Sequence, residues 1–157
     1  MKAAQVIEKD VLIDTLLRLE DPDNAGVFPI RDLVLYEGTT DEYKVFWEHV
    51  SDSVGLPYIV VAHMMGGRYQ GTATAQSYSD TTWKIAFHTS DIQSAEAMAN
   101  AIALMQDACP VCSRYTGVSP VTTLQEVMPV FDRYQVQNIP QFVVGGLYRL
   151  RLNLGDN

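Results

Sequence analysis

The sequence predicts an α+β fold: an antiparallel sheet with two main helices packed on one face and a long hairpin arm or loop. Segments with the periodicity of a helix alternate with segments rich in β-branched and aromatic residues, in the order helix, strands, helix, strand. The chain of 157 residues contains no internal repeat and no linker. We therefore expect a single domain over residues 1–157, long enough to close one hydrophobic core.

The first element is an amphipathic helix over residues 6–19, where apolar residues recur at helical spacing. Pro22 and Gly26 follow as helix breakers and end it. Residues 27–36 hold short apolar pieces, but Pro29 restricts them to an edge strand or an extended loop.

Residues 40–52 fit two structures. Thr40, Asp41 and Glu42 are typical of a helix N-cap and acidic first turn. Alternatively, Val45, Phe46 and Trp47 form a brief strand. Periodicity does not decide between them.

Two clear strands come next. Residues 56–64 are rich in β-branched and aromatic residues, and residues 81–89 alternate so that Trp83, Ile85 and Phe87 point to one side. We expect these two strands to pair. The polar stretch 69–79 between them is predicted to be a long hairpin arm or a mobile loop.

A second helix is expected from Ser90 or Asp91 to about residue 108, where Cys109 and Pro110 stop it. The structure of the insert at residues 109–138 is left open by its turn-rich composition. Within it, residues 124–131 are expected to form a short helical turn, which Pro129 limits.

The last element is a strand over residues 142–154. Gly145 and Gly146 are expected to interrupt it. After this point the pattern alternates: one side holds apolar residues and the other holds polar ones. The apolar side is Tyr148, Leu150, Leu152 and Leu154.

The formal net charge is −8, from 11 basic and 19 acidic residues. Residues 1–52 hold 12 of the acidic residues and 5 of the basic ones. An acidic total excludes a protein that grips nucleic acid by its phosphates. The acidic first third forms either a solvated surface or a surface that faces something it should repel.

No targeting signal or membrane span is predicted. The N-terminus leads directly into a charged periodic segment. The longest apolar runs, at 58–62 and 142–144, are far shorter than the roughly 20 residues that cross a bilayer. Two cysteines cannot build a secreted disulfide framework. We expect a soluble intracellular protein, or one assembled inside a cell.

Cys109 and Cys112 form a Cys-Pro-Val-Cys motif that suits a thiol-disulfide oxidoreductase. The segment 138–144, with Pro140 before a strand, resembles the proline loop of thioredoxin and glutaredoxin folds. However, the pair follows the predicted helix instead of opening one, where the helix dipole disfavours a thiolate. Pro140 also lies only 28 positions beyond Cys112, too few for the elements of that fold. Redox chemistry is therefore the weaker alternative.

No other motif indicates catalysis. His49, His63 and His88 are scattered and have no nucleophile motif or second cysteine pair beside them. Neither glycine pair has the spacing or the lysine of a phosphate-binding loop. We expect no catalytic residue, no cofactor and no metal. The sequence indicates a binding or assembly protein, not an enzyme.

Several segments carry a resemblance in a consistent order. Residues 45–50 and 56–61 pair a short strand with a strand led by Pro-Tyr, and 82–87 follows after a variable loop. Residues 90–97 open a helix, and 147–152 form an aromatic-led closing strand. This order resembles the tail terminator proteins of long-tailed, siphovirus-type bacteriophages. The insert at 109–138 and the acidic stretch at 20–42 depart from that family's pattern.

The resemblance implies that 45–47 is a strand and that the protein is a structural subunit of the virion tail or neck, assembled in the host cytoplasm. Such subunits form hexameric rings that cap the tail tube, stop its polymerisation and bind the head–tail connector, or stopper, protein. DNA passes through the lumen without specific binding, and no membrane is involved. Another neck, connector or tail completion protein is the alternative.

Four aromatic residues are candidate anchors of the ring contact, or equally members of the core: Tyr43, Trp47, Tyr69 and Tyr78. In a ring, we expect part of the acidic first third to face the lumen or a rim along the path of the DNA. The near-neutral remainder, ending in the strand of Arg149 and Arg151, would supply the sheet and the subunit contacts.

Overall fold

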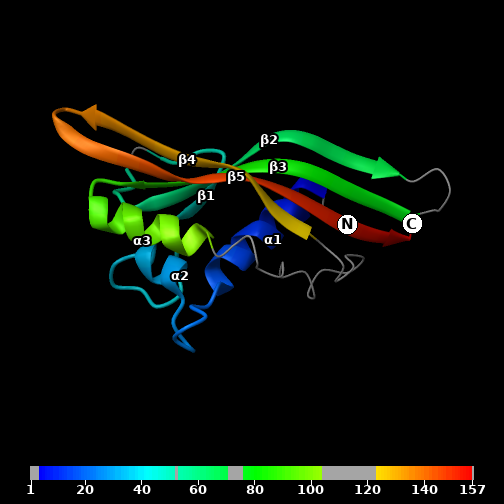
Figure 1. The fold of residues 1–157 in the computed structure, drawn as a ribbon, viewed down its shortest axis with the longest axis horizontal. Coiled ribbons are helices and arrows are strands. Elements are labelled where there is room, and N and C mark those ends of the chain that lie inside the picture. The colour runs from blue at the N-terminus through cyan, green and yellow to red at the C-terminus, as the bar shows by residue number, and fades with distance from the viewer. Residues whose placement is uncertain (1–3, 52, 71–75, 104–122, 157) are drawn as a thin grey trace.

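Three helices cover one face of a five-stranded sheet in the computed structural model, which describes residues 4–51, 53–70, 76–103 and 123–156 (Figure 1). The predicted α+β fold is confirmed. The strand order is β1-β2-β3-β5-β4; β1 runs parallel to β2 and the other pairs are antiparallel, so the sheet is mixed. The elements are α1 (Ala4–Arg18), α2 (Pro29–Leu33), β1 (Val45–Trp47), β2 (Tyr58–Gln70), β3 (Gln76–Thr89), α3 (Ile92–Ala103), β4 (Thr123–Val136) and β5 (Ile139–Asp156).

The core lies between the helices and the sheet face that they cover. Trp83, Ile85 and Phe87 of β3 are fully buried, as their alternation predicts. β5 contributes the alternating residues Tyr148, Leu150 and Leu152, also as predicted. The helices complete this core with Val11, Leu12, Leu16, Ile30, Ala95, Met98 and Ile102.

Both long helices form where the sequence predicts them. The predicted helix at 6–19 is α1, and α3 begins directly after Asp91. The Asp91 carboxylate accepts hydrogen bonds from the backbone N–H groups of Gln93 (3.3 Å) and Ser94 (3.2 Å), which caps the helix. The expected end of this helix near residue 108 lies outside the described residues, as do Cys109 and Cys112.

Two expectations for the segment before the sheet are corrected. Pro29 begins the short helix α2 instead of an edge strand, because a proline at the first helical position needs no amide hydrogen. In the ambiguous region the strand is right and the helix is wrong. Val45 and Trp47 pair with Ile59 and Val61 of β2, and this pairing outweighs the local helix signal.

The expected helical turn at 124–131 is also wrong, because these residues belong to β4. β4 pairs along its length with β5, and its position at the sheet edge tolerates Pro129. The glycine pair does not interrupt β5 either. At Gly145, with φ +152°, a Cβ would lie 1.9 Å from the carbonyl oxygen of Ile85, so glycine lets β5 approach β3 closely.

The sheet extends beyond the helices at both ends through its two hairpins (Figure 1). The predicted arm is formed by β2 and β3, which remain paired out to Gln70 and Ser77. At the other end, β3 stops at Thr89 opposite Phe142, whereas β4 and β5 continue. Gln137 and Asn138, with φ of 51° and 65°, make the tight turn between them.

Candidate subunit interface

β4 is a long edge strand with one side unpaired in the described structure. Its 14 residues pair only with β5. The opposite edge, β1, has three residues, and the backbone just before it is paired: Lys44 N–H donates to the Val34 carbonyl (2.7 Å) and Tyr36 N–H to the Glu42 carbonyl (2.8 Å). An exposed strand of this length is a template for association with another chain. β4 is therefore the edge of the sheet best suited to contact a partner.

The hairpin of β4 and β5 also exposes apolar side chains. Of the eleven large hydrophobic residues that the structure describes as exposed, six lie between positions 127 and 139, with exposed fractions of 39–58%. This concentration on one hairpin sets the region apart, because exposed apolar residues scattered singly are normal whereas a cluster of them marks an interaction surface. The cluster covers both faces of the hairpin: Phe131 lies opposite the buried Val144, and Tyr134 lies on the other face, near His88. We call these six residues the hairpin patch: Val127, Met128, Phe131, Tyr134, Val136 and Ile139.

β4 carries features that prevent uncontrolled edge pairing. The register shifts between Glu126 and Met128, Pro129 follows, and Asp132 and Arg133 place charges near the middle of the exposed hairpin. A bulge, a proline and charges are the devices that proteins use to block indiscriminate sheet extension. A partner is thus expected to contact the side chains of the hairpin patch.

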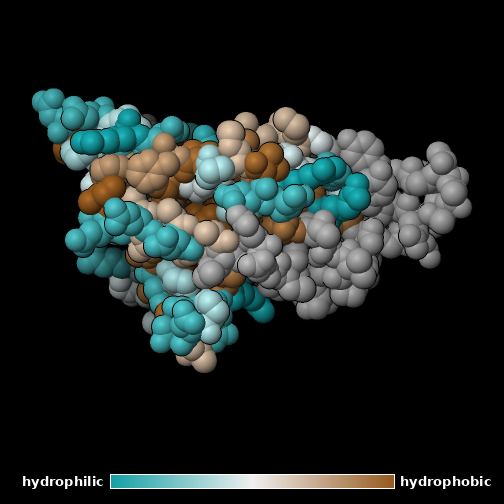
Figure 2. All heavy atoms as spheres, in the orientation of Figure 1, coloured by the Kyte–Doolittle hydropathy of each residue, from teal (hydrophilic) through white to brown (hydrophobic). Residues whose placement is uncertain are grey.

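A row of rings crosses the face of the sheet opposite the three described helices and leads to the hairpin patch. Phe46 packs edge-on against Tyr58 with ring centres 6.3 Å apart, and Tyr58 stacks on His88 at 4.9 Å. The Tyr134 hydroxyl lies 3.4 Å from Nδ1 of His88. These four residues come from β1, β2, β3 and β4, so they tie the edge strand to the middle of the sheet. In Figure 2, which views the molecule with the sheet above the helices, apolar residues lie between the hydrophilic tip of the hairpin and the middle of the molecule.

The electrostatics of this row favour uncharged rings. Burial, and then the charge of Lys84, lower the pKa of His88, so the imidazole is neutral at neutral pH. Burial and the neighbouring Tyr58 raise the pKa of the Tyr134 hydroxyl. Neutral rings cost little to desolvate, which suits a surface that a partner covers.

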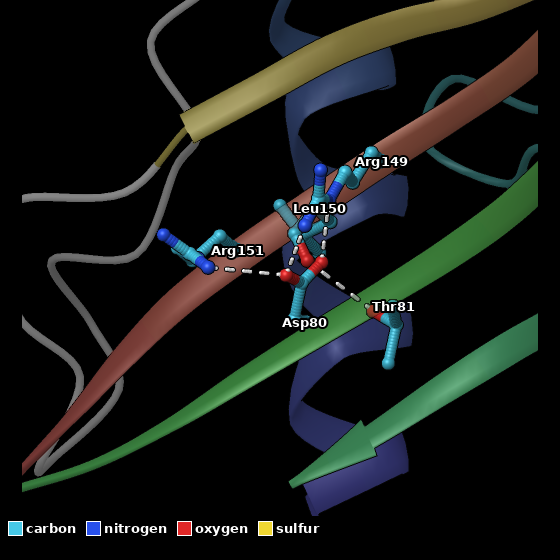
Figure 3. A network of polar contacts seen from close by, with 5 residues as sticks. All are labelled: Asp80, Thr81, Arg149, Leu150 and Arg151. Carbon is cyan, nitrogen blue, oxygen red and sulfur yellow. Dashed lines mark hydrogen bonds and ion pairs between the residues drawn. The ribbon is translucent and has the colours of Figure 1, made fainter. Parts of the chain in front are cut away.

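The same face holds an ion cluster farther along β3 and β5 (Figure 3). The Asp80 carboxylate accepts hydrogen bonds from Arg149 Nε (2.7 Å) and from Arg151 (3.2 Å). The hydrogen bond from Arg149 is the main reason that the pKa of Asp80 is lowered. The carboxylate is largely buried while both arginines are about half exposed. This cluster joins two strands, so we interpret it as structural.

The four predicted aromatic anchors do not share one environment in the structure. Tyr43 packs against the core, whereas Trp47 is exposed beneath the ammonium group of Lys9, which lies 5.1 Å from the ring centre. Tyr69 and Tyr78 face each other in the register of β2 and β3; the positions of their side chains lie outside the description.

Sequence reasoning missed Phe131, Tyr134 and Ile139 because it assigned residues 124–131 to a helical turn. A signal was present: apolar residues continue on both sides of the polar pair Gln137-Asn138, as in a hairpin.

The acidic first third is mainly a solvated surface. Glu20, Asp23 and Asp32 are exposed, and so are residues 37, 41, 42 and 48, which are all acidic. Asp10, Asp14 and Asp21 are half-buried, and Glu8 is buried.

The described residues contain no group of three or more His, Cys, Asp or Glu side chains that could hold a metal ion. His49, His63 and His88 lie in a loop, on β2 and on β3 and are not grouped. Among the described helices, none has the length and apolar character needed to cross a membrane. No model of a known protein family matches this chain, and no curated protein matches it in sequence.

Proposed function

We propose that this protein is a phage tail terminator. Copies of the chain associate into a hexameric ring in the tail or neck of the virion, cap the tail tube, stop its polymerisation and bind the head–tail connector protein. The order of the sequence segments supports this proposal, and so does an α+β domain whose two hairpins extend beyond its helices.

The hairpin patch is the observation that carries the proposal. Its apolar side chains lie on the edge strand β4 and at the start of β5 and are exposed in the described structure, and a partner that buried them would gain the free energy of removing that surface from water. A closed ring requires a heterologous contact, in which the patch of one copy meets a different surface of the next. The partner is therefore a second copy of this chain.

The charge distribution suits a ring that conducts DNA. The exposed carboxylates of residues 20–48 repel phosphates, so DNA that passes this surface does not bind to it. We infer that part of this surface faces the lumen or a rim of the ring. A ring with a basic lumen would contradict this assignment and leave the ring itself intact.

The test combines native mass spectrometry, negative-stain microscopy and a tube assay. Purified protein is expected to form hexamers and rings with a central hole, and to stop the lengthening of tubes made from the tail tube protein of the same phage. A strictly monomeric protein that also leaves the tubes unaffected would reject the proposal. Rings that bind the connector but not the tube would indicate another neck or tail completion protein.

The thiol-disulfide oxidoreductase alternative is tested by a separate experiment. Reduction of insulin by the purified protein, abolished in Cys109→Ser, would support a thiol-disulfide oxidoreductase. An inactive parent protein excludes that reaction.

A further inference from the structure

A buried polar cluster lies between α1 and the base of the β2–β3 arm. Glu8 of α1 is only 1% exposed, and Ser79 and Thr81 of β3 are buried on the sheet face that α1 covers. His63 of β2 lies on the same face, since its ring meets Trp83 edge-on with centres 5.2 Å apart. We call Glu8, His63, Ser79 and Thr81 the Glu8 cluster. Figure 3 shows α1 crossing behind β3 and β5 here, on the side away from Asp80.

The cluster is only partly satisfied by hydrogen bonds. Trp83 Nε1 donates to Thr81 Oγ1 (2.9 Å), whose hydroxyl donates to the Leu150 carbonyl (3.5 Å). In the described part of the chain, no hydrogen-bond partner reaches Glu8 Oε2, His63 Nε2 or Ser79 Oγ. Buried polar atoms are normally paired, and an ionised carboxylate in such a place is costly. The first half of α1 is therefore held by contacts that depend on protonation.

Burial is the main reason that the pKa of Glu8 is raised, and the charge of His63 partly opposes this shift. Because its pKa is raised, the Glu8 carboxyl keeps its proton to higher pH, and the protonated group carries no charge into the buried site. Once this proton is lost, the buried group is a charged carboxylate, which disfavours the docked position of the helix.

The other charged groups near the cluster have partners elsewhere. On α1, Lys9 pairs with Asp10 (2.9 Å) and lies over Trp47. Glu48, which follows β1, accepts a hydrogen bond from the backbone N–H of His63 (2.7 Å). The inward side chains of β5 nearby are leucines, and the cluster of Asp80 with two arginines lies on the opposite face.

We propose that the first half of α1 is a proton-controlled strap, which stays docked on the β2–β3 arm while the Glu8 carboxyl holds its proton and detaches when that carboxyl is ionised. The docked state binds this proton more tightly than the released state. Docking is therefore favoured below the ordinary glutamate value of 4.5 and weakens as the pH rises from there through the raised pKa of Glu8. The second half of α1, with Val11, Leu12 and Leu16, remains packed in the core.

Hydrogen exchange of the full chain between pH 5.5 and 8.5, corrected for intrinsic exchange rates, tests the strap. The amides of residues 8–11 are the first that bond inside α1. Their protection is expected to fall by up to about tenfold for each pH unit as the pH rises from the ordinary glutamate value to the raised pKa of Glu8, since one unit changes the protonated fraction tenfold. The amides of β3 and β5 are expected to keep their protection over this range.

Two variants test which side chains control the release of the strap. Glu8→Gln stays neutral and is expected to keep residues 8–11 protected at every pH, while the matched control Glu96→Gln, on the exposed side of α3, responds like the parent. His63→Gln removes the compensating charge and is expected to move the release to lower pH. If Glu8→Gln does not fold, the shift of the release to lower pH in His63→Gln tests the proposal in its place.

Protection at residues 8–11 that does not vary with pH in the parent would overturn the proposal. An unchanged pH response in a folded Glu8→Gln protein would do the same. So would a loss of protection that spreads equally into β5, because that is global unfolding. None of these readouts depends on ring formation.

Discussion

Two single residues explain how β3 and β5 stay together. Gly145 lets the strands approach at one point, and Asp80 joins them at another through two arginines. The first is a steric requirement and the second an electrostatic one, so they respond to different perturbations.

Gly145→Ala is expected to lower the free energy of unfolding by roughly 2–4 kcal/mol, because the added Cβ meets the Ile85 carbonyl oxygen and the positive φ is strained. Urea denaturation measures this loss. Gly55→Ala is the matched control, since a Cβ there meets nothing within 4 Å. Equal stability of the two variants would contradict the close approach of β5 to β3.

Asp80→Asn is expected to cost about 1–2 kcal/mol at pH 7, because the arginines lose a charged acceptor but are themselves half exposed. The pKa of Asp80 is lowered in the folded protein, so its contribution is present above the ordinary aspartate value of 3.8 and disappears as the pH falls through the lowered value. Denaturation at pH 7 and pH 2 should show the difference from the parent shrinking in acid. Asp132→Asn, at an exposed position, should change stability little at either pH.

At the scale of elements, the β4–β5 hairpin differs from the rest of the sheet because none of the described helices covers its outer part. Its turn residues Gln137 and Asn138 have positive φ, and the strands on both sides continue beyond the end of β3. The apolar side chains there contribute little to the core of the monomer, so they are free to serve association.

The double variant Phe131→Ser/Ile139→Ser is expected to weaken self-association at least tenfold while changing monomer stability by less than about 1 kcal/mol, since both side chains are more than half exposed. Sedimentation velocity over a concentration series measures the association, and thermal unfolding measures the stability. Val27→Ser, an exposed apolar residue outside the hairpin patch, should associate like the parent. Unchanged association of the double variant would remove the hairpin patch from the ring contact.

The main error of the sequence prediction concerns a single element, the strand β4. The buried strands and both long helices were predictable, since Trp83, Ile85 and Phe87 carry a local alternation and Asp91 a local cap. β4 was not predictable, because a strand at an edge has one partner and weak alternation, and Pro129 suggested a break. The candidate interface was missed together with the strand that carries it.

At the scale of the whole molecule, the protein has two distinct surfaces, the acidic loops and the hairpin patch. The acidic loops between α1 and β2 lie apart from the hairpin patch in the chain, and most of their carboxylates are exposed. In a ring, a substituted residue is present once in every subunit. One substitution in this surface therefore changes the charge around the lumen by the number of subunits.

Glu42→Lys is expected to make the assembled ring retain double-stranded DNA at low salt, and to release it as the salt concentration rises above about 0.1 M, where charges are screened beyond roughly 10 Å. Retention of labelled DNA on the ring measures this. Glu96→Lys changes the net charge equally from α3 and should retain less DNA. Equal retention by both variants would show that residue 42 does not lie along the DNA path.

The sequence alone determined the α+β class, the acidic first third and the faces of the central strands, because composition, alternation and helix caps are properties of neighbouring residues. Only the tertiary structure decided that β1 runs parallel to β2, that residues 123–136 form the edge strand and that Glu8 is buried near His63. These features depend on strands and helices far apart in the chain, and the free energy of their packing outweighs what any local segment prefers.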